Sequence, residues 1–110
     1  MKELRTVNEW YDVLEQSKKN PLFVLKHSTT CPVSAAAYNA FESSEAEVPK
    51  YFLKVQESRP VSNEIESNLR VEHQSPQLFL LKDGKAVWQA THYSISGSKI
   101  GLAVKEYGSK

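Results

Sequence analysis

The chain has 110 residues, of which 40% are hydrophobic and 25% charged, and its net charge is +1. This length predicts one domain, residues 1–110, with an ordinary globular composition. The small net charge gives no electrostatic reason to expect nucleic acid or a membrane as partner. The N-terminus lacks the apolar segment of a signal peptide, and no apolar run reaches membrane-spanning length. One cysteine cannot form an internal disulfide, so the reducing cytoplasm is the expected location.

The first predicted elements are a helix and a buried strand. Thr6 and Glu9 have the spacing of a capping box, and apolar side chains then repeat at helical intervals until Pro21 ends the helix. Residues 22–25 are continuously apolar and are flanked by helix-breaking residues. This pattern is typical of a strand that is covered on both faces and belongs to a parallel pair.

Cys31 follows this strand and precedes an alanine-rich helical segment, residues 33–41. Pro32 suits the first helical position, where its missing N–H costs nothing. The unpaired N–H groups and the dipole of a helix N-terminus stabilise a thiolate, so Cys31 is a candidate nucleophile. Against this stands the fact that an isolated cysteine is most often an inert side chain. Ser34 occupies the place of the second cysteine in Cys-x-x-Cys, and we expect its hydroxyl to donate to the sulfur.

The second half of the chain predicts a helix between two strands, then a hairpin and a last helix. Ala86, Trp88 and Ala90 are expected on one face of the returning hairpin strand, and Ser98 is expected to cap the last helix. The predicted elements are a strand at 51–55, a helix opened by Pro60, a strand at 78–81, a turn at Asp83–Gly84, a strand at 85–91 and a helix from residue 98.

This order joins a parallel βαβ half to a β-hairpin half, with helices on both faces. It predicts an α/β, thioredoxin-like fold with a central mixed sheet of about four strands flanked by helices. Pro76, just before a strand, is the candidate for the cis-proline that faces the cysteine in this fold. A cis bond would expose the Ser75 backbone to an extended thiol-containing ligand. The alternative is a trans proline that only opens the strand.

The chain resembles the monothiol bacilliredoxins, which are thioredoxin-like proteins of low-GC Gram-positive bacteria. The resemblance is carried by residues 26–34, 55–63 and 73–77 and by the pattern from Trp88 to His92. The resemblance covers nearly the whole chain. It implies that the protein removes bacillithiol, the low-molecular-weight thiol of those bacteria, from oxidised cysteines of client proteins. In this family pattern Cys31 is the nucleophile and Ser34 replaces the resolving thiol.

The activity implied is that of a monothiol thiol–disulfide oxidoreductase with bacillithiol as co-substrate and no tightly bound cofactor. The expected partners are S-bacillithiolated client proteins, with free bacillithiol or a partner reductase recycling the thiol. No metal is expected, because one thiolate and three scattered histidines lack the spacing of a zinc site. The expected site residues are Cys31 and Ser34 as catalytic residues and Thr29, Thr30, Pro32, Ser75 and Pro76 as substrate-binding residues.

Two other functions remain open at this stage. One is a thioredoxin-fold adaptor without exchange activity, and the other is an iron–sulfur carrier like some monothiol glutaredoxins, with a cluster shared through Cys31. Lys26 and His27 are expected to add positive potential near the groove. Weaker candidates for carboxylate contacts are Arg59, His73 and His92.

Overall fold

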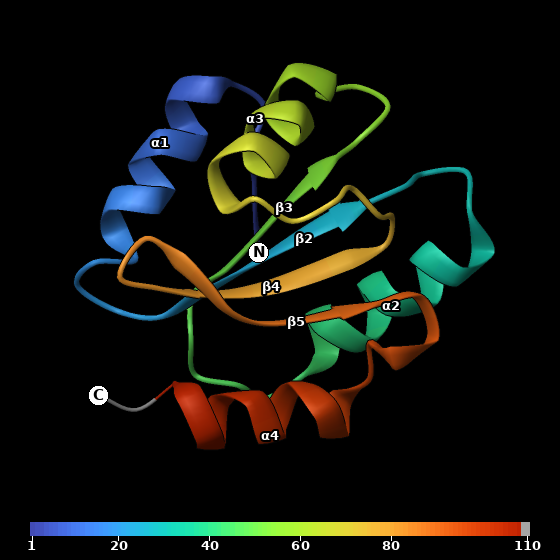
Figure 1. The fold of residues 1–110 in the computed structure, drawn as a ribbon. Coiled ribbons are helices and arrows are strands. Elements are labelled where there is room, and N and C mark those ends of the chain that lie inside the picture. Colours follow the sequence, from blue (N-terminus) through green and yellow to red (C-terminus); the bar gives the residue numbers. More distant parts are fainter. Residues whose placement is uncertain (109–110) are drawn as a thin grey trace.

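The computed structural model describes residues 1–108, and these form a mixed sheet with helices on both faces (Figure 1). The strands are β1 (Lys2–Glu3), β2 (Leu22–His27), β3 (Lys50–Lys54), β4 (Gln77–Lys82) and β5 (Lys85–Thr91). The helices are α1 (Val7–Gln16), α2 (Pro32–Ser43), α3 (Arg59–Leu69) and α4 (Gly97–Tyr107), with a short 3-10 helix η1 (His92–Ser94). The predicted thioredoxin-like fold is confirmed, and the two-residue β1 adds a fifth strand to the expected sheet.

The strand β2 lies at the centre of the sheet, whose order is β1-β3-β2-β4-β5. It pairs in parallel with β3 and antiparallel with β4. Five of its six residues are buried, because helices cover the sheet on both faces. The continuous apolar pattern of residues 22–25 therefore predicted the strand's environment correctly.

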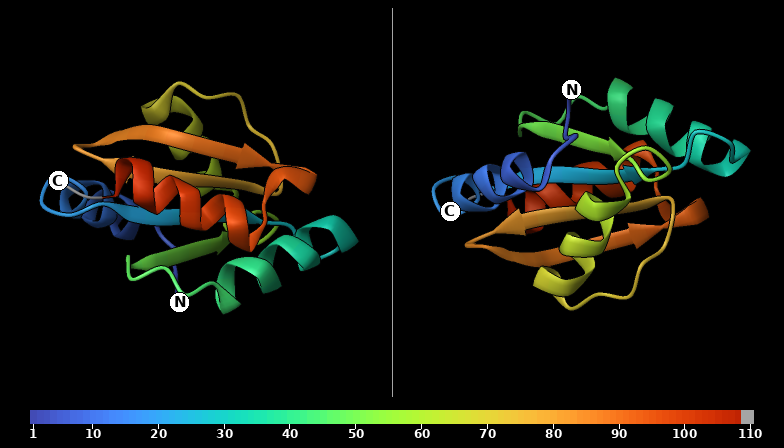
Figure 2. Two further views of the ribbon diagram at one scale, coloured as in Figure 1. Left: turned by 90° about the horizontal axis from the view of Figure 1, so that it is seen from below. Right: turned by 90° about the horizontal axis from the view of Figure 1, so that it is seen from above.

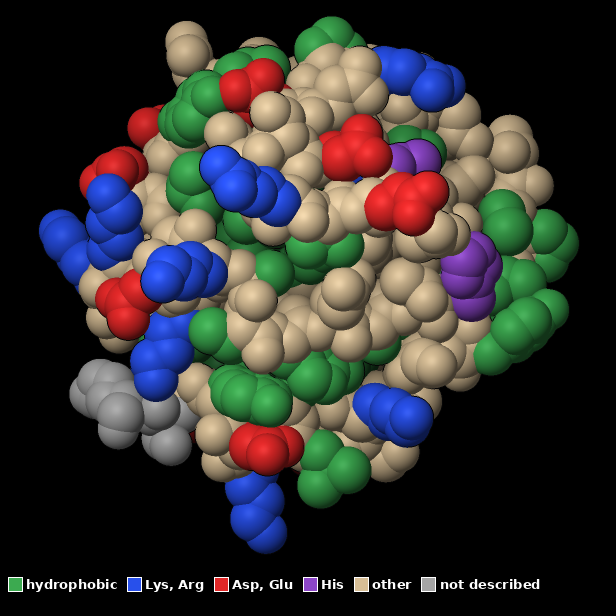
Figure 3. All heavy atoms as spheres, in the orientation of Figure 1, with side chains coloured by type: hydrophobic (Ala, Val, Ile, Leu, Met, Phe, Trp, Pro, Cys, Tyr) green, Lys and Arg blue, Asp and Glu red, His purple; other side chains and the backbone are tan. Residues whose placement is uncertain are grey.

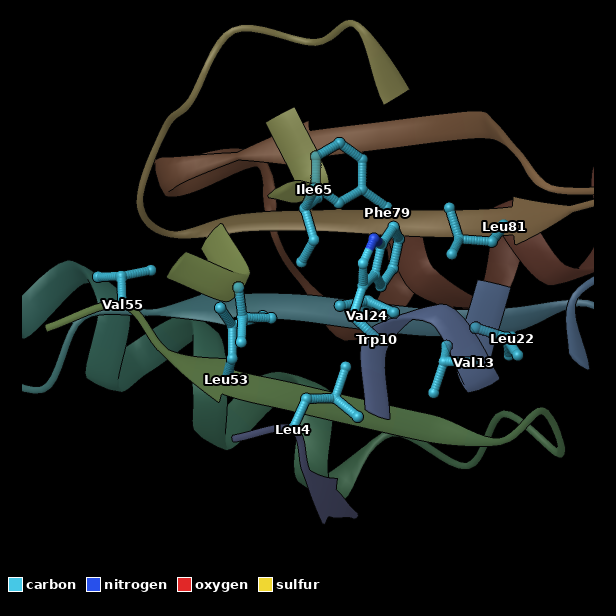
Figure 4. Packing of buried hydrophobic residues seen from close by; sticks show 11 residues of the cluster. Leu4, Trp10, Val13, Leu22, Val24, Leu53, Val55, Ile65, Phe79 and Leu81 are labelled. Carbon is cyan, nitrogen blue, oxygen red and sulfur yellow. The ribbon is translucent and has the colours of Figure 1, made fainter. Parts of the chain in front are cut away.

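Two hydrophobic clusters form, one on each face of the sheet. The first joins α1 and α3 to the sheet and is centred on Trp10, which is fully buried (Figure 4). The second joins α2 and α4 to the opposite face, where Phe23 of β2 meets Phe41 of α2 edge to face with ring centroids 5.6 Å apart. Figure 2 shows the two helix layers from two further sides. Each face of β2 thus contributes to a different core.

The surface carries both signs of charge. On the face drawn in Figure 3, Lys and Arg side chains lie interspersed with Asp and Glu side chains. None of the helices in the described part of the chain is long and apolar enough to cross a membrane.

The helix starts follow local sequence signals, with one correction. Both hydrogen bonds of the capping box between Thr6 and Glu9 are present at the start of α1. The last helix is capped by Ser96, whose Oγ accepts the N–H of Lys99 at 3.2 Å, and not by Ser98 as the sequence predicted. Ser96 precedes the helix in extended conformation, which is the geometry of an N-cap.

The strand β5 departs from simple alternation. A bulge shifts its register against β4, so that Leu80 pairs with Trp88 while Leu81 pairs with Ala86. Val87 is the extra residue of the bulge. An extra residue breaks the alternation of a strand, so the side chains two positions apart on either side of it point to opposite faces of the sheet. Trp88 consequently packs in the core under α2 and α4, whereas Ala86 packs on the other side of the sheet. The expectation that Ala86 shares a face with Trp88 was wrong.

The capping box gives a stability prediction for α1. Replacing Thr6 by Ala removes the acceptor for the Glu9 N–H and should lower the free energy of unfolding by about 0.5–2 kcal/mol. Urea denaturation followed by tryptophan fluorescence would measure the change. Asn8→Ala is the matched control, because Asn8 is exposed in the same first turn and Ala is the better helix former. An equal loss in both variants would contradict a capping role for Thr6.

Candidate active site

Cys31 occupies the N-cap position of α2, at the end of the loop that leaves β2. Its backbone is extended, with φ −110° and ψ 123°, and its carbonyl accepts the N–H of Ala35 at 3.0 Å. Pro32 stands in the first turn, as expected. The side chain of Cys31 is half-buried and makes no capping hydrogen bond. The thiol therefore lies at a helix N-terminus whose first N–H groups are not capped by its own side chain.

Ser34 is fully buried in the first turn of α2, but its hydrogen bonds differ from those expected. Its Oγ accepts the N–H of Ser28 at 2.8 Å and lies 2.9 Å from Nδ1 of His27. Burial lowers the pKa of His27, which favours the neutral ring. Ser34 therefore bonds to Ser28 and His27, in place of the contact with the sulfur of Cys31 that the sequence predicted.

His27 links the end of β2 to α2. Its ring packs on Tyr38 with centroids 4.8 Å apart, and Tyr38 in turn meets Phe52 of β3 edge to face at 5.3 Å. Because the ring is neutral and packed under the helix, His27 acts here as a packing and hydrogen-bonding residue. The expectation that it adds positive potential to the groove is not supported by the direction of its pKa shift.

Gln56 holds the outer side of the thiol loop, a role that the motif alone did not reveal. Its Oε1 accepts the N–H of Thr29 at 3.1 Å, and its Nε2 donates to Oγ of Ser28 at 2.8 Å and to Oγ1 of Thr30 at 3.1 Å. The predicted binding residues Thr29 and Thr30 are exposed on this loop. A single amide side chain therefore fixes three consecutive residues just before Cys31.

The Ser75–Pro76 peptide bond is cis, so the predicted geometry of this loop is confirmed. The carbonyl of Pro76 accepts the N–H of His92 at 3.1 Å, which joins the loop to the end of β5. The residue after Pro76 begins β4 and pairs with Lys26 near the end of β2. The cis-proline loop and the loop of Cys31 therefore leave neighbouring strands at the same end of the sheet (Figure 1).

Lys26 is buried between the sheet and α3. It is 0% exposed, and its Nζ lies 3.1 Å from Nδ1 of His73, which is also 3.3 Å from Oγ of Ser62 on α3. Burial lowers the pKa of Lys26 to about 8, against the opposing effect of Glu66. Burial, and next the charge of Lys26, lower the pKa of His73. Lys26 is therefore buried against α3 with the exposed His73 beside it, and it does not supply the positive potential that the sequence suggested.

Among residues 1–108, no three His, Cys, Asp or Glu side chains come together in a group that could hold a metal ion.

A thiol at a helix N-terminus, at the end of a mixed sheet where a cis-proline loop also lies, is the arrangement of a thioredoxin-fold protein. Solved thioredoxins share this fold. The Fasciola hepatica protein matches with a TM-score of 0.77 and 15% identity, covering 97% of this chain and 99% of that chain. The Schistosoma mansoni protein matches with a TM-score of 0.76 and 19% identity, covering 96% of this chain and 95% of that one.

A further solved structure, provisionally assigned as an oxidoreductase with a thioredoxin fold, is 38% identical with a TM-score of 0.85. The match covers 93% of this chain and 91% of that chain. The family model of the monothiol bacilliredoxin BrxC matches residues 2–100. The chain therefore belongs to the monothiol bacilliredoxin family, and is a thiol oxidoreductase of thioredoxin fold.

The buried Lys26 gives a pH prediction. Its folded pKa of about 8 lies below the ordinary value of 10.5, so between these values the unfolded chain binds more protons. Deprotonation of Lys26 in the folded protein should therefore make the free energy of unfolding rise as the pH increases from about 8 to 10.5. Lys26→Met, of similar volume, should be no less stable than wild type at pH 7 and should lack this rise. Denaturation of both proteins from pH 7 to 10.5 would test it, and parallel stability curves would contradict it.

Proposed function

We propose that this protein removes bacillithiol from S-bacillithiolated client proteins by thiol–disulfide exchange at Cys31. The observation that carries the proposal is the placement of the chain's only thiol at the N-cap of α2, with a buried serine at the second position of the motif. A thiolate so placed can attack a disulfide, and no second cysteine can then displace the captured thiol. This chemistry suits a protein that exchanges with small-thiol mixed disulfides.

The reaction has two exchange steps. The Cys31 thiolate attacks the bacillithiol sulfur of the client mixed disulfide, a Cys31–bacillithiol bond forms, and the client sulfur leaves as a thiolate that takes up a proton. A second thiol then attacks the bacillithiol sulfur and regenerates the Cys31 thiolate. Free bacillithiol, which is thereby oxidised to its disulfide, or a partner reductase supplies that thiol. Bacillithiol is a co-substrate in this scheme, and no tightly bound cofactor is needed.

The cis-proline loop is the proposed docking place for the incoming disulfide. In the described part of the chain, the Oγ of Ser75 is buried without a hydrogen-bond partner, which is uncommon for a buried hydroxyl. We assign it, together with the Ser75 backbone, to an extended ligand lying across the groove, with Pro32 and Pro76 as apolar contacts. The cytoplasm is the proposed location, because thiol-dependent reduction needs a reducing compartment.

Intact-mass spectrometry after incubation with bacillithiol disulfide tests the assignment directly. The expected result is one bacillithiol added per chain, absent from Cys31→Ser and removed by excess bacillithiol. An unmodified thiol that also alkylates slowly would support a thioredoxin-fold adaptor instead. An absorbance band at longer wavelength than that of the protein, absent from the Cys31→Ser variant, would support an iron–sulfur carrier.

The two motif positions should respond differently to substitution. Cys31→Ser should abolish release of bacillithiol from a bacillithiolated client, because the nucleophile is gone. Ser34→Ala should keep the reaction but slow it, and should lower the free energy of unfolding by about 1–3 kcal/mol, because the Ser28 N–H loses its partner. Mass spectrometry of the client would measure the rate of bacillithiol release, and urea denaturation would measure the free energy of unfolding. Complete loss of release in a folded Ser34→Ala protein would place Ser34 in the chemistry itself.

A further inference from the structure

Gln56 is presented to the thiol loop by a turn that is itself fixed. The turn joins β3 to α3, and the N–H of Val55 donates to the carbonyl of His27 at 2.9 Å. The N–H groups of Glu57 and Ser58 both donate to the carbonyl of Lys54, at 3.0 and 2.9 Å. The backbone on either side of Gln56 is therefore tied to the sheet, and the side chain acts from a rigid base.

The partners of Gln56 determine which way its amide points. The backbone N–H of Thr29 can only donate, so the atom facing it at 3.1 Å must be the carbonyl oxygen Oε1. The NH₂ group then faces Ser28 and Thr30, whose hydroxyl oxygens accept from Nε2. A hydroxyl that accepts from Nε2 keeps its own proton for another acceptor. Thr29 differs, because its hydroxyl lies 3.4 Å from Oε1 and donates to it.

We propose that Gln56 is a positioning residue that turns the hydroxyl protons of Ser28 and Thr30 toward a carboxylate on the small-thiol half of the disulfide attacked by Cys31. Both hydroxyl oxygens lie within 3.1 Å of one nitrogen, so they are close enough together to serve a single carboxylate. Hydrogen bonds to an ionised acceptor are stronger than hydrogen bonds to a neutral one, so two hydroxyl donors favour a ligand with a carboxylate over a neutral ligand. This inference rests on the proposed function and specifies how its ligand is recognised.

Alkylation of Cys31 by two small reagents tests the proposal without bacillithiol. Iodoacetate carries a carboxylate and iodoacetamide a neutral amide, and the quantity of interest is the ratio of their rate constants. Thr30→Val removes one donor and should lower this ratio about threefold or more, while the iodoacetamide rate is unchanged. Gln56→Met removes the orienting amide with little change in volume and should lower the ratio at least as much. Ser43→Ala is the control, because this exposed hydroxyl at the other end of α2 donates to the carbonyl of Asn39 and the ratio should be unchanged.

The double variant Gln56→Met, Thr30→Val separates positioning from a general structural effect. If Gln56 acts through Thr30, the ratio in the double variant should fall no further than in Gln56→Met alone. A purely structural role would change both rate constants equally and leave the ratio intact, which would overturn the proposal. The proposal would also be overturned if the two substitutions lowered the ratio independently, so that their separate fold-changes multiplied in the double variant. Thr30 is exposed, so Thr30→Val keeps the test valid even where Gln56→Met is unstable.

The outcome also separates this inference from the proposed function. A ratio that responds as expected in a protein that never accepts bacillithiol would refute the bacillithiol assignment and leave the carboxylate site. Normal bacillithiol exchange with an unresponsive ratio would refute the role of Gln56 alone.

Discussion

The burial of β2 on both faces is the constraint on which the rest of the molecule depends. One face of the strand packs under α1 and α3 and the other under α2 and α4, while β3 and β4 pair with its two edges. A strand held on four sides has a fixed end, and the chain leaves that end at His27. Only three residues separate His27 from Cys31, so the position of the thiol is set by the sheet core.

Ser28 shows how the short loop beyond this strand is kept in place. Its backbone N–H donates to the buried Ser34 on the inner side, and its hydroxyl accepts from Gln56 on the outer side. The inner contact comes from α2 and the outer contact from the turn before α3, so two elements on opposite faces of the sheet hold the same residue. An ordered thiol loop reduces the conformational freedom that an attacking sulfur must lose.

Local patterns were sufficient for the fold because each one reports a strong physical preference. The run at residues 22–25 predicted the central strand, and the capping box of Thr6 predicted the start of α1. The bulge at Val87 could not be predicted, because it depends on the register of two strands and not on either sequence alone. The cap at Ser96 was missed because two serines two residues apart both satisfy the same local rule.

The site was predictable in its backbone but less so in its side-chain contacts. The cysteine, the proline after it and the cis-proline loop follow from the motif and the element order. Ser34 bonds to His27 and Ser28 within the Cys31 motif, and Gln56 reaches that motif from the turn after β3. These contacts depend on three-dimensional geometry and not on local sequence. Lys26 lies on the same face of β2 as Leu22 and Val24, the face covered by α3. Its burial was not predicted, because a lysine is rarely fully buried.

The contacts of Ser34 also bear on why one thiol is enough. The position that would hold a second cysteine is 0% exposed, and its oxygen accepts the Ser28 N–H and shares a hydrogen bond with Nδ1 of His27. Sulfur is a weak acceptor and an S–H a weak donor, so a cysteine there would hold the loop less firmly. The serine therefore does more than omit a resolving thiol, because it orders the loop that carries the first one. In the proposed reaction, release of a captured thiol is consequently left to a second molecule.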